Sequence, residues 1–318
     1  MRLGVCLQAL YDVDLQTALE EAASIGFRAV ELPVDRRSPF VDLDEESTAV
    51  SRLTRALHHT GLEISALSNH QEGQLLLGPH GADTDLILPG DALAKIEFAK
   101  ARLIRTADLA RQLGVSVVCA FTGCEDSSRW FPWPLPDGYE RMAPTFRERL
   151  LPVLDGFGDR NVRLALECHP RQFAYNLETA LWALELVEHH QALAFNLDPA
   201  NLVLAGMDPV VFAVELGDRV VHVHAKDCEL VRHNVGRSGL LAHGEWARRD
   251  RGFRFRIPGW GDVRWKSLIT ELQLVGYSGV LAVEHEDPTM DRREGLRQAF
   301  SYLSTLVLEE PPPRDQWW

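Results

Sequence analysis

The sequence lacks the features of several protein classes. Its 318 residues contain no run of 18 apolar residues and, at the start, no apolar stretch followed by a small-residue cleavage site. We therefore expect neither a membrane span nor a secretory signal. The five cysteines are an odd number and lie far apart, mostly within apolar runs. This usage is typical of buried free thiols in a reducing compartment, so we expect a cytoplasmic protein.

Positive charge is also scarce. There are 33 lysines and arginines against 46 aspartates and glutamates, which gives a formal net charge of −13. The overall field of such a chain repels polyanions, which argues against nucleic acid and anionic membrane surfaces as partners. With 46% hydrophobic and 25% charged residues, the composition is that of an ordinary globular protein.

Short apolar runs alternate with longer stretches of helical periodicity along the chain. Eight such runs are expected to be strands, at residues 3–10, 27–34, 62–68, 115–122, 162–168, 193–198, 220–225 and 279–285. Their continuous apolar character implies burial on both faces, so we predict an α/β fold with a (β/α)8 TIM barrel. An open doubly wound sheet is the alternative. However, residues 8–14 after the first strand contain no glycine, whereas a phosphate-binding loop there would need several.

No linker or low-complexity stretch divides the chain. We expect one barrel domain over residues 1–310, closed by a helix at 292–308, and a proline-rich tail at 311–318. Two connections, 70–90 and 226–261, are unusually long and would overhang the carboxyl-end mouth of the barrel, where active sites lie. The second connection carries seven arginines, and Arg256 lies in a segment whose proline and glycines define a turn.

Polar residues stand at the carboxyl ends of four consecutive predicted strands. They are Glu167 and His169, then Asp198, then His222 and His224, then Glu284 and Glu286. Three carboxylates that converge on one rim repel one another unless they are protonated or neutralised. A divalent cation bound with one imidazole resolves this, and oxygen and nitrogen ligands suit Mn²⁺, Mg²⁺, Co²⁺ or Zn²⁺. A lysine or arginine in the place of the ion would remove the basis for this chemistry.

Four segments, at residues 68–75, 222–227, 255–261 and 283–287, carry a family resemblance. With the strand-end acids, they resemble the xylose-isomerase-like barrel superfamily of sugar isomerases, sugar epimerases and apurinic endonucleases, and within it the sugar phosphate isomerase/epimerase group. The resemblance implies one divalent metal ion, Mn²⁺ by preference. It implies Glu167, Asp198, His224 and Glu284 as the ligands, with Glu167 and Glu284 also carrying protons.

The resulting hypothesis is a sugar isomerase or epimerase that abstracts a proton next to the carbonyl of a keto-sugar through an enediolate. The expected substrate contacts are His70, His169, Asn201, Lys226 and Arg256. Asn201 stands where some sugar epimerases of the superfamily carry a substrate-binding histidine. Glu31 and His70 are both candidates to line the mouth, with His70 favoured by its sequence context, and His222 is expected either to support the site or to contact substrate.

Several alternatives stay open. The same proton removal on a 3-keto-glycoside could expel its substituent, which would make the protein a metal-dependent lyase or deglycosidase. An apurinic endonuclease needs a basic face, against which the negative charge argues. A non-catalytic sugar-binding barrel would lack some of the ligands. The arginines permit a phosphorylated substrate, but without a glycine-rich anion cradle we predict a neutral sugar. A homo-oligomer is possible.

Overall fold

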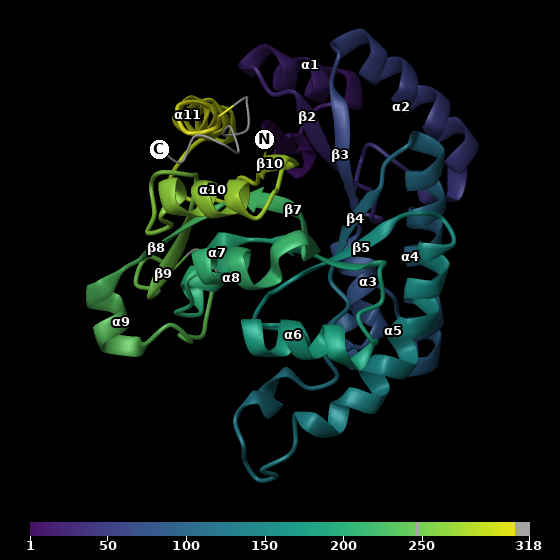
Figure 1. Cartoon of the computed structure of the whole chain (residues 1–318), viewed down its shortest axis with the longest axis vertical. Coiled ribbons are helices and arrows are strands. Elements are labelled where there is room, and N and C mark those ends of the chain that lie inside the picture. The colour runs from purple at the N-terminus through teal and green to yellow at the C-terminus, as the bar shows by residue number, and fades with distance from the viewer. Residues whose placement is uncertain (246–247, 309–318) are drawn as a thin grey trace, which may run out of the picture.

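Eight parallel strands close into a barrel in the computed structural model, which describes residues 1–245 and 248–308 (Figure 1). The barrel strands are β1 (Arg2–Cys6), β2 (Ala29–Pro33), β3 (Glu63–Ser68), β4 (Val117–Ala120), β5 (Arg163–Glu167), β6 (Leu193–Leu197), β7 (Val220–Ala225) and β10 (Val280–Val283). β1 pairs with both β2 and β10, so the wall is continuous. The predicted TIM barrel is therefore confirmed, while the predicted tail at 311–318 lies outside the described residues.

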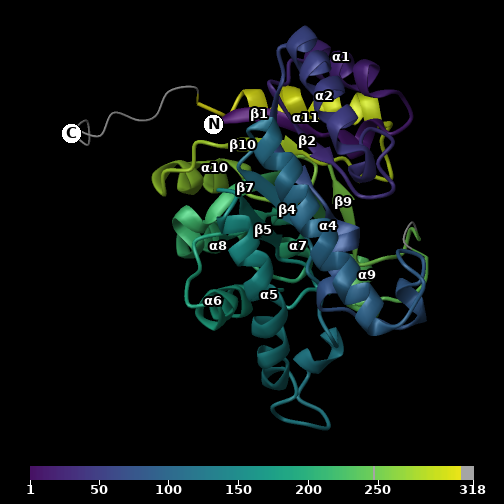
Figure 2. The ribbon, with the colours of Figure 1, turned by 90° about the vertical axis from the view of Figure 1, so that its right-hand side faces the viewer.

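Helices surround the barrel and connect its strands (Figure 1). They are α1 (Leu15–Ile25), α2 (Glu46–Thr60), α3 (His70–Gly73), α4 (Ala92–Leu113), α5 (Ala143–Gly158), α6 (Leu177–Leu186), α7 (Pro199–Leu204), α8 (Pro209–Leu216), α9 (Arg232–Ser238), α10 (Trp265–Leu274) and α11 (Arg292–Ser304). Gly26 and Gly114 end α1 and α4 with φ of +116° and +71°, a backbone region that favours glycine. α11 lies beside α1, so the last helix closes the outer layer (Figure 2). Among the described residues, no helix has the length and apolar character needed to cross a membrane.

Two segments differ from the sequence-based expectation. The first apolar run ends as a strand at Cys6 and continues as a 3₁₀ turn, Leu7–Leu10, because an apolar run alone does not separate a strand from a buried helical turn. The connection after β7 carries a second sheet of two antiparallel strands, β8 (Asp227–Leu230) and β9 (Phe253–Arg256), with α9 between them. This long connection is thus largely ordered structure at one side of the barrel (Figure 1).

The connection after β3 is held by a buried lysine. Lys95 of α4 is fully buried. Its ammonium donates to the carbonyls of His80 and Gly81 at 3.1 and 3.0 Å, and to the hydroxyl of Thr84 at 3.0 Å. It also pairs with Asp85 at 2.6 Å. These contacts fix the connection against the outer helix, so the residues that precede it at the mouth have a rigid support.

Candidate active site

The four side chains predicted as metal ligands come together at the carboxyl end of the barrel. Glu167 is the last residue of β5 and His224 lies in β7, while Asp198 and Glu284 directly follow β6 and β10. The side chains of Glu167, Asp198 and His224 are 4%, 0% and 1% exposed, whereas Glu284 is 13% exposed. Solvent therefore reaches this group of side chains mainly at Glu284.

Asp198 is fixed by the local sequence that follows it. It is the N-cap of α7, and its Oδ1 accepts the backbone N–H of Ala200 at 2.9 Å. Pro199 opens this helix, where its fixed φ is suited to the first turn. Asn201 then donates from Nδ2 to Asp198 Oδ2 at 2.8 Å and to Glu167 Oε1 at 2.9 Å. The amide of Asn201 therefore ties the acids of two neighbouring strands together.

His224 lies between three carboxylates. Its Nε2 donates to Glu31 Oε2 at 2.7 Å. Its Nδ1 lies 3.1 Å from Glu167 Oε2 and 3.3 Å from Glu284 Oε2. This Nδ1 is buried and makes no hydrogen bond. The ring is thus held by one nitrogen and presents the other to the two acids that were predicted to carry protons.

Glu167 is surrounded by polar groups. Its Oε2 accepts from Nδ2 of Asn196 at 3.0 Å. Nε2 of His70, the first residue of α3, lies 3.3 Å from the same oxygen. The sequence analysis missed Asn196, although a single amide within an apolar strand was a usable signal. His70 does lie beside a predicted ligand, and its contact with substrate stays a prediction.

Three buried polar atoms around Glu167 have no hydrogen-bond partner. They are His70 Nε2, Asn201 Oδ1 and His224 Nδ1, out of seven such side-chain atoms among the described residues. Unpaired buried polar atoms are rare in folded proteins, and each calls for an explanation. Two of them, His70 Nε2 and His224 Nδ1, lie 3.3 and 3.1 Å from Glu167 Oε2 as ion-pair contacts without regular hydrogen-bond geometry, so donors and acceptors for a polar ligand or an ion gather around this carboxylate.

Lys226 neutralises part of the acidic group. Its ammonium lies 2.8 Å from Asp198 Oδ2, 2.7 Å from Glu284 Oε2 and 3.2 Å from Glu286 Oε2. Its Nζ also stands 4.7 Å from the centre of the Phe255 ring. The lysine therefore takes one oxygen from each of two predicted ligands. To contact substrate, the ammonium would have to leave one of these acids. The predicted contact of Lys226 with substrate stays a prediction.

The residues present fit a divalent cation. Two groups of potential ligand atoms, each within 4.8 Å, share His224: one adds His70 and Glu167, and the other adds Asp198 and Glu284. Four buried or nearly buried carboxylates, counting Glu31, face Lys226 and the imidazoles of His70 and His224. Burial opposes protonation of the two imidazoles, but the neighbouring carboxylates outweigh it and raise their pKa values, so a divalent ion would take over a role that protons fill here. The free Nδ1 and the oxygens of Glu167, Asp198 and Glu284 form a donor set suited to Mn²⁺, Mg²⁺ or Zn²⁺. Lys226 thus meets in part the condition that the sequence analysis set against a metal site, since its ammonium pairs with two of the four predicted ligands. Glu167 pairs with the imidazoles of His70 and His224 instead, so an ion at this rim would share only Asp198 and Glu284 with the lysine.

The charges at the site shift its pKa values in opposite directions. Burial opposes ionisation of Glu284, but Lys226 and His224 outweigh it and lower the pKa of this acid. For Asp198, burial together with the charges of Glu167 and Glu284 outweighs Lys226 and raises the pKa. The two acids that share the lysine therefore differ in basicity, and Glu284 is the one held ionised.

His169 and Arg256, also predicted to contact substrate, have other surroundings. His169 is partly exposed, but desolvation of its ring lowers the pKa of the imidazole to about 4 and keeps it neutral. Its Nδ1 accepts the backbone N–H of Arg171 at 3.4 Å. Arg256 pairs with Glu229 and with Asp287, both at 2.8 Å. Arg256 would have to release one of these partners to bind substrate, and both roles stay predictions.

Other arginines of the connection after β7 are also held by partners within the chain. Three of them are held within the connection: Arg248 by Asp250, Arg254 by Glu229, and Arg251 by backbone carbonyls. These contacts order the connection, and the prediction of a substrate without phosphate stays a prediction.

Comparison with known proteins places this geometry in context. A family model described as xylose isomerase-like TIM barrel matches residues 19–306. The uncharacterized protein YfiH of Bacillus subtilis is 26% identical over 334 residues, covering 96% of this chain and 99% of that protein. The rhizopine catabolism protein MocC of Rhizobium meliloti is 27% identical, covering 87% of this chain and 76% of that protein. Inosose dehydratase of Lacticaseibacillus casei is also 27% identical, covering 60% of this chain and 65% of that protein.

Solved structures share the fold at low identity. The probable 3-DHS dehydratase AsbF of Bacillus anthracis superimposes with a TM-score of 0.68 at 19% identity, covering 96% of this chain and 99% of that one. The 3-keto-D-glucoside 4-epimerase YcjR of E. coli gives a TM-score of 0.68 at 14% identity and the same coverage. The IolI protein with a zinc atom gives 0.65 at 17% identity, again with 96% and 99% covered. The structural neighbours thus include both epimerases and dehydratases.

Proposed function

Because the chain belongs to the xylose isomerase-like TIM barrel family, we propose that it is a divalent-metal-dependent isomerase or epimerase of a keto-sugar. One observation carries this proposal: the acids at the carboxyl ends of β5 and β10 converge on Nδ1 of His224, at 3.1 and 3.3 Å, and this nitrogen makes no regular hydrogen bond. Glu167, Asp198, His224 and Glu284 would hold the ion. When bound, the ion would polarise the sugar carbonyl and stabilise the negative charge that develops on its oxygen.

The two glutamates would move the proton. Glu167 and Glu284 come from strands separated by β6 and β7, and both reach His224, so a substrate between them would be flanked by two bases. Removal of a proton on one face and its return on the other inverts a carbon, which is epimerisation. Transfer of the proton between adjacent carbons interconverts an aldose and a ketose. Both glutamates would be ionised at neutral pH, because neighbouring imidazoles, and for Glu284 also Lys226, outweigh burial and lower their pKa values; either could therefore accept the proton.

Elimination is the second candidate function. Inosose dehydratase is a relative of this chain, and the neighbouring structures include a probable 3-DHS dehydratase. The chemistry begins in the same way, with a proton removed next to a carbonyl, and ends with loss of a leaving group from the adjacent carbon. Lys226, 2.7 Å from Glu284, would supply a proton donor for that group. A lyase acting on 3-keto-glycosides belongs to this candidate.

Incubation with a panel of keto-sugars in D₂O tests the two functions together. With Mn²⁺ present, we expect a product of unchanged composition that carries solvent deuterium at the carbon next to the carbonyl, measured by mass spectrometry and NMR. Loss of water or of a glycosidic substituent would identify the lyase instead. If no member of a panel of ketohexoses, inososes and 3-keto-glucosides is converted or labelled, with or without divalent metal, the proton-abstraction proposal fails.

Three further expectations belong to this proposal. Mn²⁺ is the preferred ion and Mg²⁺, Co²⁺ and Zn²⁺ the others. The five cysteines are buried and unpaired in the structure, which supports a cytoplasmic location. The net charge of −13 supports a small sugar rather than nucleic acid as the partner, and it disfavours an apurinic endonuclease.

A further inference from the structure

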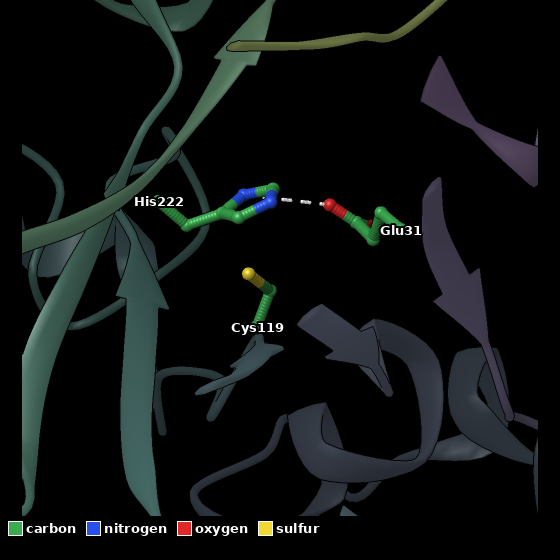
Figure 3. A group of neighbouring side chains, drawn as sticks. All are labelled: Glu31, Cys119 and His222. Atoms are coloured by element: carbon green, nitrogen blue, oxygen red, sulfur yellow. Dashed lines mark ion pairs between the residues drawn. The ribbon is translucent and has the colours of Figure 1, made fainter. Parts of the chain in front are cut away.

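Glu31 is an acid in the interior of the barrel. It lies in the middle of β2 and is fully buried. The pairing between β2 and β3 shifts register between Val30 and Glu31, a kind of irregularity that re-aims a side chain. Figure 3 shows Glu31, Cys119 of β4 and His222 of β7 pointing toward one another across the barrel. A buried carboxylate costs free energy unless it is paired, so its partners indicate its role.

The shortest contact of Glu31 is with His224. The 2.7 Å distance from Nε2 to Glu31 Oε2 is that of a charge-assisted hydrogen bond. An ionised carboxylate only accepts, so Nε2 carries the hydrogen. By the same rule Nδ1, which faces two carboxylates, carries a hydrogen while no ion is bound; an ion at Nδ1 would take the place of that hydrogen and leave the hydrogen on Nε2 with Glu31. That Nδ1 is the atom that faces Glu167 and Glu284.

Glu31 is itself held in place. Its Oε1 accepts from the thiol of Cys6 at 3.6 Å, and His222 Nδ1 lies 3.6 Å from its Oε2 (Figure 3). His222 is fixed in turn by Asn196 Oδ1 at 3.1 Å and by the hydroxyl of Ser65 at 3.2 Å. The carboxylate therefore has a defined position from which to orient the His224 ring.

We propose that Glu31 is a positioning residue that fixes the tautomer and orientation of His224, so that Nδ1 is presented to the divalent cation. This inference rests on the proposed function, because it concerns the same ion. Carboxylates that bind the second nitrogen of a metal-ligating histidine raise its basicity and fix its ring. Their loss costs about 10–100-fold in metal affinity.

The group of Glu31, Cys119 and His222 is a rival location for an ion, since its potential ligand atoms lie within 4.8 Å. Its donors are less available. Burial raises the pKa of the Cys119 thiol well above its usual range, which keeps it protonated. Both nitrogens of His222 already have hydrogen-bond partners. We therefore assign this group to supporting His224.

Metal binding tests the inference directly. Co²⁺ is titrated into the metal-free full-length chain, and its affinity and visible absorption spectrum are compared among the wild type, Glu31→Ala, Glu31→Gln and Cys119→Ala. We expect one ion per wild-type chain and a 10–100-fold weaker affinity with an altered spectrum for Glu31→Ala. Glu31→Gln keeps the shape of the side chain and remains informative if Glu31→Ala does not fold. The Co²⁺ affinity of Glu31→Gln should be at least about tenfold weaker than that of the wild type. The glutamine amide can donate to Nε2 as well as accept from it, so it also stabilises the other tautomer of His224. Cys119→Ala should bind as the wild type does.

A second measurement reports the tautomer without activity. In ¹⁵N-histidine NMR of the zinc-loaded protein, the resonance lost in His224→Gln identifies the ring. We expect its Nε2 to be protonated in the wild type and the hydrogen-bonded Nε2–H signal to shift or disappear in Glu31→Gln. A merely structural role of Glu31 would lower stability without changing this signal in folded protein.

The outcomes separate the two proposals. Equal affinities and spectra for the wild type and Glu31→Gln would overturn the role of Glu31 and leave the proposed function standing. Equal losses in Cys119→Ala and Glu31→Ala would place the ion in the inner group and overturn the assignment to His224. A wild type that binds no divalent ion would overturn the metal-dependent function, and the inference with it.

Discussion

Glu284→Gln and Glu167→Gln are each expected to lower kcat by about 10²–10⁴-fold while the protein remains folded. Glutamine keeps the shape of the side chain but does not accept a proton. Both acids lie within 3.3 Å of His224 Nδ1, so they are placed to act on one bound substrate. Activity is measured on the substrate found in the D₂O panel, at saturating Mn²⁺, and folding by circular dichroism.

Glu286→Gln is the matched control for these variants. Glu286 also contacts Lys226, at 3.2 Å, but its side chain is 35% exposed, and it lies outside the group around His224. We expect a change in kcat of less than tenfold. Full activity in Glu284→Gln would reject its role as a proton carrier, whatever the control shows.

Lys226→Met is expected to make the metal-free protein unstable and dependent on a divalent cation. Methionine retains the apolar contacts of the lysine stem, but Asp198 and Glu284 lose their shared ammonium. Removing one partner of a buried ion pair typically costs about 3–5 kcal/mol. A divalent ion at the same oxygens should restore stability, by about 2.7 kcal/mol at 100 times its Kd. Urea unfolding with and without Mn²⁺ measures both effects.

The chain offers a second buried lysine as the control. Lys95 binds carbonyls and Asp85 in the connection after β3, away from the acids of the site. Lys95→Met should also destabilise the protein, but Mn²⁺ should raise its stability no more than that of the wild type. If Mn²⁺ stabilises Lys226→Met no more than Lys95→Met, the ion and the lysine do not share ligands.

The fold and the rim of the site were accessible from sequence because they follow from local patterns. The barrel is indicated by apolar runs that are long enough for buried strands. Glycines such as Gly26 and Gly114 mark the ends of the helices between these runs. Asp198 and Glu284 stand one residue beyond their strands, where polar residues at the end of an apolar run mark the mouth. Their approach to one another then follows from the geometry of a closed parallel barrel.

The contacts inside the barrel were not accessible in the same way. Glu31 and His224 are 193 residues apart on strands that are not neighbours, so no spacing in the sequence predicts their hydrogen bond. Lys226 illustrates the same limit. Lys226 is two residues after His224, so the alternation of side chains along a strand places both on the face toward the barrel interior. Whether the ammonium of Lys226 contacts substrate or Asp198 depends on side-chain packing. For Arg256, the partner Asp287 comes from a different connection.

The location of a bound ion tests the central claim most directly. An anomalous-difference map from a crystal soaked in Mn²⁺ should show one peak per chain, coordinated by Glu167, Asp198, Glu284 and Nδ1 of His224. A map without a peak at this rim, with Lys226 still between Asp198 and Glu284, would contradict the account. A single peak among Glu31, Cys119 and His222 would contradict it as well.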